Sequence, residues 1–151
     1  MRSRVDVVAI PSEIGDFSEE VRRVFLELGR VFGPDLLAGE CTPTLDVYET
    51  DETVEIVVDL PGVDRSALRV LSKGEGILIA GEKPARRVLG ESTFHLVERG
   101  YGRFARVVRV TQSCDMSRAD AVLEAGELRI SLPKIQDRRG ATRPIAVRAR
   151  E

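Results

Sequence analysis

Residues 121–134 read AVLEAGELRISLPK, two short apolar runs on either side of a single glycine. In the second run Leu128, Ile130 and Leu132 are spaced as in a β-strand, where alternate side chains point to the same face, and the first run alternates Ala121, Leu123 and Ala125 in the same way. Gly126 tolerates the backbone angles of a tight turn, and Pro133 lacks the N–H that a longer ladder would need. The stretch therefore predicts two antiparallel strands joined by a tight connection, with the second strand ending at Pro133.

The same two-residue period extends toward the N-terminus as far as Pro43. Six further runs are short, rich in Val, Ile and Leu, and separated by turn signals: TLDVYET, TVEIVVDL, LRVLS, GILIAGEK, STFHLVER and RFARVVRV. Eight candidate strands with no long helix between them predict an all-β fold. The expected architecture is an immunoglobulin-like antiparallel β-sandwich over residues 43–134.

An N-terminal arm, residues 1–42, precedes these strands and contains one helical pattern. Its apolar residues recur at helical spacing: Phe17, Val21, Val24, Phe25, Leu28 and Phe32. Asp16 and Glu19 resemble a capping box, and Gly33-Pro34 stops the run, so a short amphipathic helix is expected. Two interpretations stay open: the apolar face packs on the domain's own core, or it is offered to another chain.

A C-terminal extension, residues 135–151, follows the strands and is mostly polar. Near its end, Pro144 excludes helix for Arg143 and favours an extended backbone, which places Ile145 and Val147 on the same side. An extended peptide with two branched residues on one face complements the edge of an open sheet. The alternative is a stray apolar pair in a disordered tail, since isolated surface apolar residues are common.

The charge balance and the cysteine content limit the partners and the cellular compartment to be expected. The chain has 23 basic and 25 acidic residues and a net charge of −2. This balance creates no positive field for nucleic acid or an anionic membrane, so neither is expected as a partner. Cys41 and Cys114 match neither a CxxC pair nor a disulfide framework, and the N-terminus has no apolar signal-peptide run. A reducing, cytoplasmic setting is expected.

The sequence contains few residue patterns that could support catalysis. His95 is the single histidine, which rules out a histidine-rich metal site and leaves one residue around which a catalytic triad would be built. It lies in FHLVER, where the alternation indicates a half-exposed strand histidine. GEGILIAGEK lacks the order of a phosphate-binding loop. We therefore expect no enzyme activity, no cofactor and no metal.

Several blocks, in their order and spacing, are similar to those of the α-crystallin domain of small heat-shock proteins. They are PTLDVYETDE, DLPGVDRSALRV, ERGYGRFARVVRV and AVLEAGELRISLPK, within residues 43–134. Ala121, Gly126 and Leu128 occupy the fixed positions of the family's A-x-x-x-n-G-v-L signature. Ala125 stands where the family often has Asn and Glu127 where it has Val; both lie beside a turn, where they should alter solvent-facing chemistry more than fold.

The resemblance implies a strand-swapped dimer. In bacterial and plant relatives, the loop that corresponds to residues 84–99 carries a strand exchanged with a second subunit. Glu98 on that strand and Arg106 on RFARVVRV match the family's intersubunit acid–arginine pair. The alternative for both residues is a solvated strand face, because exposed pairs contribute only about 0–1 kcal/mol.

The resemblance also implies a larger oligomer built from dimers. Ile145-Ala146-Val147 matches the family's C-terminal I-x-I/V motif, which inserts into a groove of a neighbouring dimer. That groove lies between the strands equivalent to LRVLS and ADAVLEA, and we expect Leu68, Val70 and Val122 to line part of it.

The function implied is that of an ATP-independent holdase chaperone, which binds partly unfolded proteins and prevents their aggregation. Client contact would come from the apolar face of the N-terminal helix and from the vacated groove. A second hypothesis is a monomeric adaptor or co-chaperone of the related sandwich type that docks one folded partner. Such domains lack both the exchanged-strand loop and the C-terminal anchor, and this chain has candidates for both.

Overall fold

The computed structural model describes residues 11–32, 41–85, 88–135, 142 and 144–149. Within these ranges seven strands form, each matching one of the predicted runs to within one residue at its ends. They are β1 (Leu45–Glu49), β2 (Thr53–Asp59), β3 (Leu68–Lys73), β4 (Gly76–Lys83), β5 (Gly102–Arg109), β6 (Asp120–Glu124) and β7 (Glu127–Pro133). The last strand ends at Pro133, as the sequence predicts.

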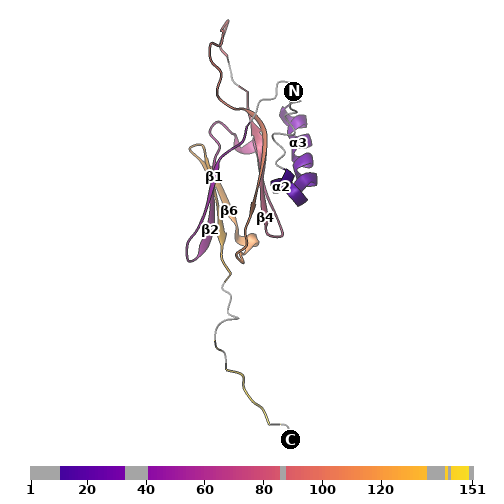
Figure 1. The fold of residues 1–151 in the computed structure, drawn as a ribbon, viewed down its shortest axis with the longest axis vertical. Coiled ribbons are helices and arrows are strands. Elements are labelled where there is room, and N and C mark those ends of the chain that lie inside the picture. Colours follow the sequence, from indigo (N-terminus) through magenta and orange to yellow (C-terminus); the bar gives the residue numbers. More distant parts are fainter. Residues whose placement is uncertain (1–10, 33–40, 86–87, 136–141, 143, 150–151) are drawn as a thin grey trace.

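The strands form two antiparallel sheets. The four-stranded sheet has the order β1-β2-β7-β6 and the three-stranded sheet the order β3-β4-β5. Figure 1 shows the two sheets face to face, with β1, β2 and β6 in one layer and β4 in the other. The predicted antiparallel β-sandwich is confirmed.

The main core lies between the sheets and follows the alternation of the strands. Along β2, Val54, Ile56 and Val58 are buried, while the residues between them are partly exposed. Ile56 is aligned with Ile130 of β7, so the apolar side chains of neighbouring strands meet on the inner face. The polar residues between them consequently lie on the outer face of the four-stranded sheet.

The N-terminal arm adds a third layer on the outer face of the three-stranded sheet (Figure 1). It comprises α2 (Pro11–Ile14), a 3-10 turn (Gly15–Phe17) and α3 (Ser18–Phe32). A second core cluster joins the arm to the sheet and contains Ile14, Phe17, Val21, Val24, Leu28, Ala67, Leu78, Ala80, Ala105 and Val107. In this structure, the first of the two interpretations of the helix is therefore correct.

The start of the helix differs from the sequence prediction. Asp16 and Glu19 do not form a capping box, because Asp16 lies inside the 3-10 turn and the chain is already helical at Pro11. Ile14, at the head of the 3-10 turn, has helical backbone angles and no side-chain cap. The predicted stop of the helix, Gly33-Pro34, lies outside the described residues.

Polar contacts hold α3 along β3. Lys73 donates to the backbone oxygen of Asp16 at 2.5 Å and to the carboxylate of Glu20 at 2.7 Å. Its ammonium lies 4.9 Å from the centre of the Phe17 ring. Two turns further along α3, Arg69 pairs with Glu27. The hydrogen bond from Lys73 lowers the pKa of the Glu20 carboxyl, which keeps this contact charged at neutral pH.

The run STFHLVER does not form a strand within the single chain. Between β4 and β5 the described residues, 84–85 and 88–101, have neither helix nor strand. This connection projects beyond one end of the sandwich (Figure 1). The predicted strand is therefore wrong for the isolated chain, where STFHLVER has no neighbouring strand with which to pair.

Candidate docking site at the sheet edges

The first open edge lies where β3 and β6 end their respective sheets. Val70 is aligned with the core residue Ile79 and Leu68 with Gly81, so both side chains point inward. Both are partly buried and pack against the main core, as does Leu123 of β6. We call Leu68, Val70 and Leu123 the edge seam. Two of the three residues predicted for the anchor groove therefore lie on the inner side of one edge.

Val122, the third predicted groove residue, lies on the other face of its strand. It is aligned with Arg129, whose side chain points outward to the hydroxyl of Tyr48, and it is 47% exposed. Leu123, aligned with the buried Leu128, takes the inward position instead. A two-residue turn at Ala125-Gly126 pairs Leu123 with the apolar Leu128. Counting residues across this turn would therefore have identified Leu123 as the inward residue.

Similar capped turns lead into both strands of the edge seam. Before β3, Oδ1 of Asp64 accepts hydrogen bonds from the backbone N–H and the hydroxyl of Ser66, both at 2.8 Å. Before β6, Oδ1 of Asp115 accepts the same two bonds from Ser117, at 3.1 and 2.5 Å. These bonds lower the pKa of both carboxyls, since they favour the charged form. The sequence pattern Asp-x-Ser thus sets how each edge strand begins.

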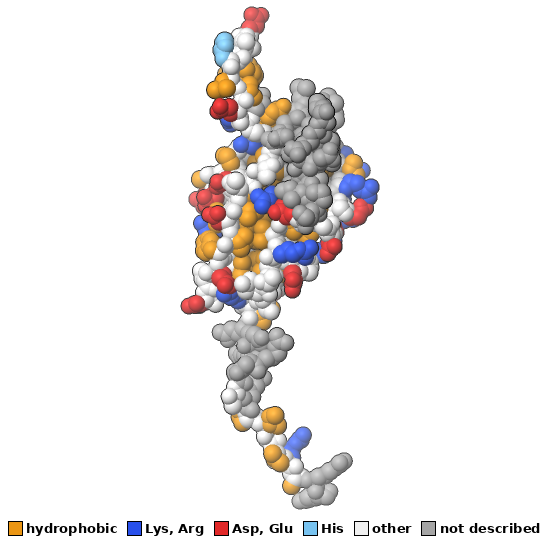
Figure 2. Space-filling model, viewed as in Figure 1, with side chains coloured by type: hydrophobic (Ala, Val, Ile, Leu, Met, Phe, Trp, Pro, Cys, Tyr) orange, Lys and Arg blue, Asp and Glu red, His pale blue; other side chains and the backbone are white. Residues whose placement is uncertain are grey.

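The second open edge lies where β1 and β5 end the sheets on the opposite side. Val47 of β1 is aligned with the core residue Ile56 but is 48% exposed, since no strand covers it. Arg106 of β5 is aligned with Ile79, so its side chain leaves the strand on the inner side. Figure 2 shows apolar side chains gathered between the two sheets on the face in view.

Arg106 is engaged within its own chain. Its Nε and Nη2 donate to the two carboxylate oxygens of Glu13 at 3.0 Å each, and its Nη1 donates to the backbone oxygen of Pro43 at 2.7 Å. Glu98 is exposed on the projecting connection. The predicted pair of Glu98 and Arg106 is intersubunit, so it stays a prediction, while the partner that Arg106 has here is one that sequence analysis missed.

The projecting connection carries exposed apolar side chains of the kind that could cover the second edge. Phe94 is 53% exposed and Leu96 is 74% exposed. Figure 2 shows this apolar material on the segment that projects from the sandwich. One chain thus presents both an uncovered apolar edge and an uncovered apolar segment.

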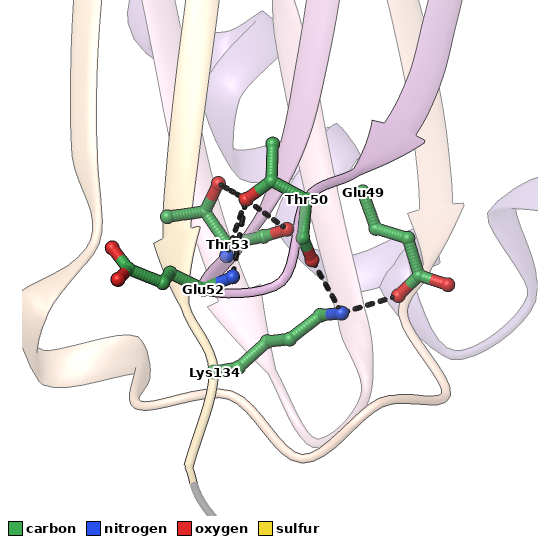
Figure 3. Close-up of polar contacts among 5 residues, drawn as sticks. All are labelled: Glu49, Thr50, Glu52, Thr53 and Lys134. Carbon is green, nitrogen blue, oxygen red and sulfur yellow. Dashed lines mark hydrogen bonds and ion pairs between the residues drawn. The ribbon is translucent and has the colours of Figure 1, made fainter.

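The C-terminal extension leaves β7 at a fixed point. The Lys134 ammonium contacts the Glu49 carboxylate at 2.8 Å and donates to the backbone oxygen of Thr50 at 2.7 Å (Figure 3). The backbone N–H of Ile135 donates to Ser113 at 2.8 Å. Further along, the side chains of Ile145 and Val147 are 89% and 96% exposed. The base of the tail is therefore held by the sandwich, while its apolar pair is exposed.

The residues expected to contact clients are mostly buried in this state. Phe17, Val21, Val24 and Leu28 belong to the cluster under the arm, and Phe25 is partly buried beside them. The side chain of Phe32 lies outside the described residues. Client contact through this face would require α3 to leave the sheet.

No catalytic arrangement emerges from the residues that the structure describes. Among them, no three His, Cys, Asp or Glu side chains are placed to hold a metal ion. His95 is exposed, and burial raises the pKa of the Cys41 and Cys114 thiols, which disfavours the reactive thiolate. No helix in the described ranges is long and apolar enough to cross a membrane.

The sandwich with its two open edges defines an α-crystallin type of domain, and comparison with known proteins agrees. Residues 46–148 match the Hsp20/alpha crystallin family. The chain therefore belongs to this family, which comprises the small heat-shock proteins.

Individual relatives resemble the chain over most of its length. Heat shock protein 16 of Schizosaccharomyces pombe is 30% identical over 102 residues, which are 66% of this chain and 71% of that protein. The solved structure of heat shock protein 16.0 from the same yeast gives a TM-score of 0.61 at 30% identity, over 72% of this chain and 100% of that one. A small heat-shock protein from Xylella fastidiosa gives 0.56 at 29% identity, over 74% and 98%.

Proposed function

We propose that this protein is an ATP-independent holdase chaperone of the cytoplasm, built as an oligomer of dimers. The observation that supports the proposal most is that one chain has both open apolar sheet edges and exposed apolar segments that could cover them. Each open edge has an apolar inner side, and an exposed apolar segment of the same chain suits each edge. A chaperone role is also what membership of the small heat-shock protein family leads us to expect.

The dimer would form at the second edge. An extended segment containing Phe94 and Leu96 would add a strand beside β1 of a second copy and cover the exposed Val47. The run STFHLVER has strand alternation but no strand in the isolated chain, as expected for a segment that is completed by a partner. Glu98 would then approach Arg106 of the other copy.

Larger assembly would use the edge seam. Ile145 and Val147 of one dimer would dock against Leu68, Val70 and Leu123 of another. Burial of one Ile and one Val yields roughly 3–6 kcal/mol, against about 1–2 kcal/mol for each ordered backbone residue and the cost of association. A single tail would therefore bind weakly, and several tails in a closed assembly would hold through effective concentration. The Xylella fastidiosa relative is described as having a distinct high order structure.

Client binding would follow from the opening of these contacts. A chaperone that binds unfolded or partly folded chains competes with their aggregation by mass action and needs no fuel. The surfaces available would be the edge seam after a tail has left and the apolar face of α3 after it has left the sheet. In this proposal no residue is catalytic.

The first experiment compares the native mass of the wild type with that of Ile145→Ala/Val147→Ala by light scattering after size exclusion. We expect a large assembly for the wild type and dimers for the double variant. Arg148→Ala is the matched control, because it changes the same stretch of tail without touching the apolar pair. A wild type that is monomeric would contradict the dimer and the anchor together and favour the adaptor hypothesis.

The activity itself is tested by light scattering of a heat-unfolded reporter enzyme, without ATP. The wild type should suppress aggregation increasingly as its concentration is raised, as mass action requires. A protein that assembles but leaves the aggregation unchanged at any ratio would disprove the chaperone role while leaving the assembly intact.

A further inference from the structure

The contact between Glu13 and Arg106 joins two residues that are far apart in the sequence. Both carboxylate oxygens of Glu13 accept from the guanidinium, and the side chains are only 22% and 20% exposed. Two parallel charge-assisted bonds of this kind fix direction as well as strength. Glu13 therefore occupies the Nε–Nη2 side of Arg106, and the oxygen of Pro43 occupies part of the remaining side.

Glu13 also binds the backbone of the edge strand. The N–H of Val107 donates to its Oε2 at 3.3 Å. Because β5 is an edge strand and this N–H donates to Glu13, it would otherwise be available to an incoming chain. One carboxylate thus covers both a charged side chain and a backbone donor at the second edge.

An exchanged segment would place its own carboxylate, that of Glu98, at the same guanidinium. Phe94, Leu96 and Glu98 are two residues apart, so in a strand all three share one face. If Phe94 and Leu96 turn inward to cover the apolar edge, Glu98 turns inward as well, which is the side on which Arg106 leaves β5. Two carboxylates from different chains therefore have the same guanidinium as their target.

We propose that Glu13 is an intramolecular latch that competes with Glu98 of a second copy for Arg106. This inference rests on the proposed dimer and adds a means of controlling it. In the latched state α2 lies on the edge of β5, and in the exchanged state Glu98 replaces Glu13 there. Two like charges at one guanidinium repel each other, so the two states oppose one another.

The latch couples assembly to exposure of the arm. α2 runs directly into the 3-10 turn and α3, so loss of the Glu13 contact removes one of the attachments that hold the arm on the sheet. The contacts of α3 with β3 through Lys73 and Arg69 would then act without support from the β5 side. Coupling between sites is reciprocal, so arm docking weakens the dimer by the same factor as dimer formation weakens arm docking.

The test measures, by sedimentation over a dilution series of the full chain, the concentration at which half of the chains are monomeric. Glu13→Gln keeps the side-chain shape and removes the competing charge, so we expect this concentration to fall by about tenfold, corresponding to about 1.4 kcal/mol. Glu98→Gln should raise it. Glu19→Gln is the matched control, because Glu19 lies in the same arm and pairs with Arg22 on the surface, away from β5.

Hydrogen exchange of the α3 amides gives a second readout. Protection should fall as the wild type passes from monomer to dimer, and in Glu13→Gln it should be low at every concentration. An unchanged or raised dissociation concentration in Glu13→Gln would overturn the latch and leave the proposed assembly standing. If the wild type and Glu13→Gln are both monomeric throughout, the dimer fails and the latch fails with it, whereas dimers in Glu13→Gln alone would support the latch.

Discussion

Gly76 lies directly under the ring of Phe17. A Cβ at position 76 would stand 2.5 Å from Cε2 and 3.0 Å from Cζ of that ring, closer than van der Waals contact permits. The absence of a side chain at the start of β4 is therefore what lets the arm approach the three-stranded sheet. This single position links the sequence of a strand to the docking of a helix some fifty residues earlier in the chain.

Gly76→Ala should loosen the arm without unfolding the sandwich. Overpacking of this kind costs about 1–3 kcal/mol, and Phe17 can relieve it by moving out. Limited proteolysis within the arm should become faster, while the melting of the sandwich changes little.

Gly29→Ala is the matched control for that variant. A Cβ at position 29 would make an ordinary contact, 3.6 Å from a guanidinium nitrogen of Arg103, and the position lies inside α3. Since glycine is unfavourable within a helix by about 1 kcal/mol, this change should slow proteolysis of the arm. Equal rates for the two variants would show that the fit at Gly76 does not control docking.

Gly81→Ala should destabilise the sandwich itself. A Cβ there would stand 2.4 Å from the backbone oxygen of Ala67 and 2.9 Å from Cζ of Phe104, a fully buried ring. A backbone atom and a core ring have no free space into which to move, so we expect the free energy of unfolding to fall by about 3 kcal/mol. Urea unfolding measures this directly, and a loss below about 0.5 kcal/mol would contradict the packing described at this site.

Leu123 and Val122 separate the two faces of β6. If the edge seam binds the tail, Leu123→Ser should reduce the native mass of the assembly, because Leu123, like Leu68 and Val70, lies inward against the main core. Val122→Ser should leave the mass unchanged, since Val122 points to solvent on the outer face. The two variants change neighbouring positions by the same kind of substitution, so the reverse result would place the groove on the other face.

Acid should destabilise the two capped turns. The pKa values of Asp64 and Asp115 are lower in the folded chain than in the unfolded chain, where about 3.9 is usual for aspartate. As the pH falls, the unfolded chain therefore takes up these protons first, so the stabilisation is present above about pH 4 and is lost below it. Thermal melting of the wild type and of Asp64→Asn/Asp115→Asn checks this, and the two melting curves should converge at low pH.

Most of the fold prediction came from the alternation of apolar and polar residues along each run. Seven of the predicted runs became strands because their apolar residues repeat every second position and have a neighbouring strand to complete them. STFHLVER has the same alternation, yet a strand needs a partner for its backbone, and no neighbouring strand in the described chain supplies one. The pattern within a run cannot show whether that partner exists.

The sites were predicted less completely. Leu68 and Val70 lie on the inner side of their strand, whereas Val122 lies on the outer face of β6, so its place in the groove stays a prediction. Which residues of β6 turn inward depends on the length of the Gly126 turn. Glu13 could not be assigned to Arg106, since 93 positions separate the two and no local pattern links them. The burial of the helix face was one of two open interpretations, and the missing side chain at Gly76 and the buried side chain of Leu78, both on a distant strand, decided it.

The arm and the outer face of the three-stranded sheet bury each other, and this has a consequence for what the proposed chaperone can capture. A segment that binds to either surface has to displace a competitor attached to the same chain, whose effective concentration lies in the millimolar range for a short tether. The docking free energy of α3 therefore sets a threshold for capture. Folded proteins, with apolar residues scattered singly over their surfaces, fall below that threshold, and chains that expose a contiguous apolar stretch exceed it.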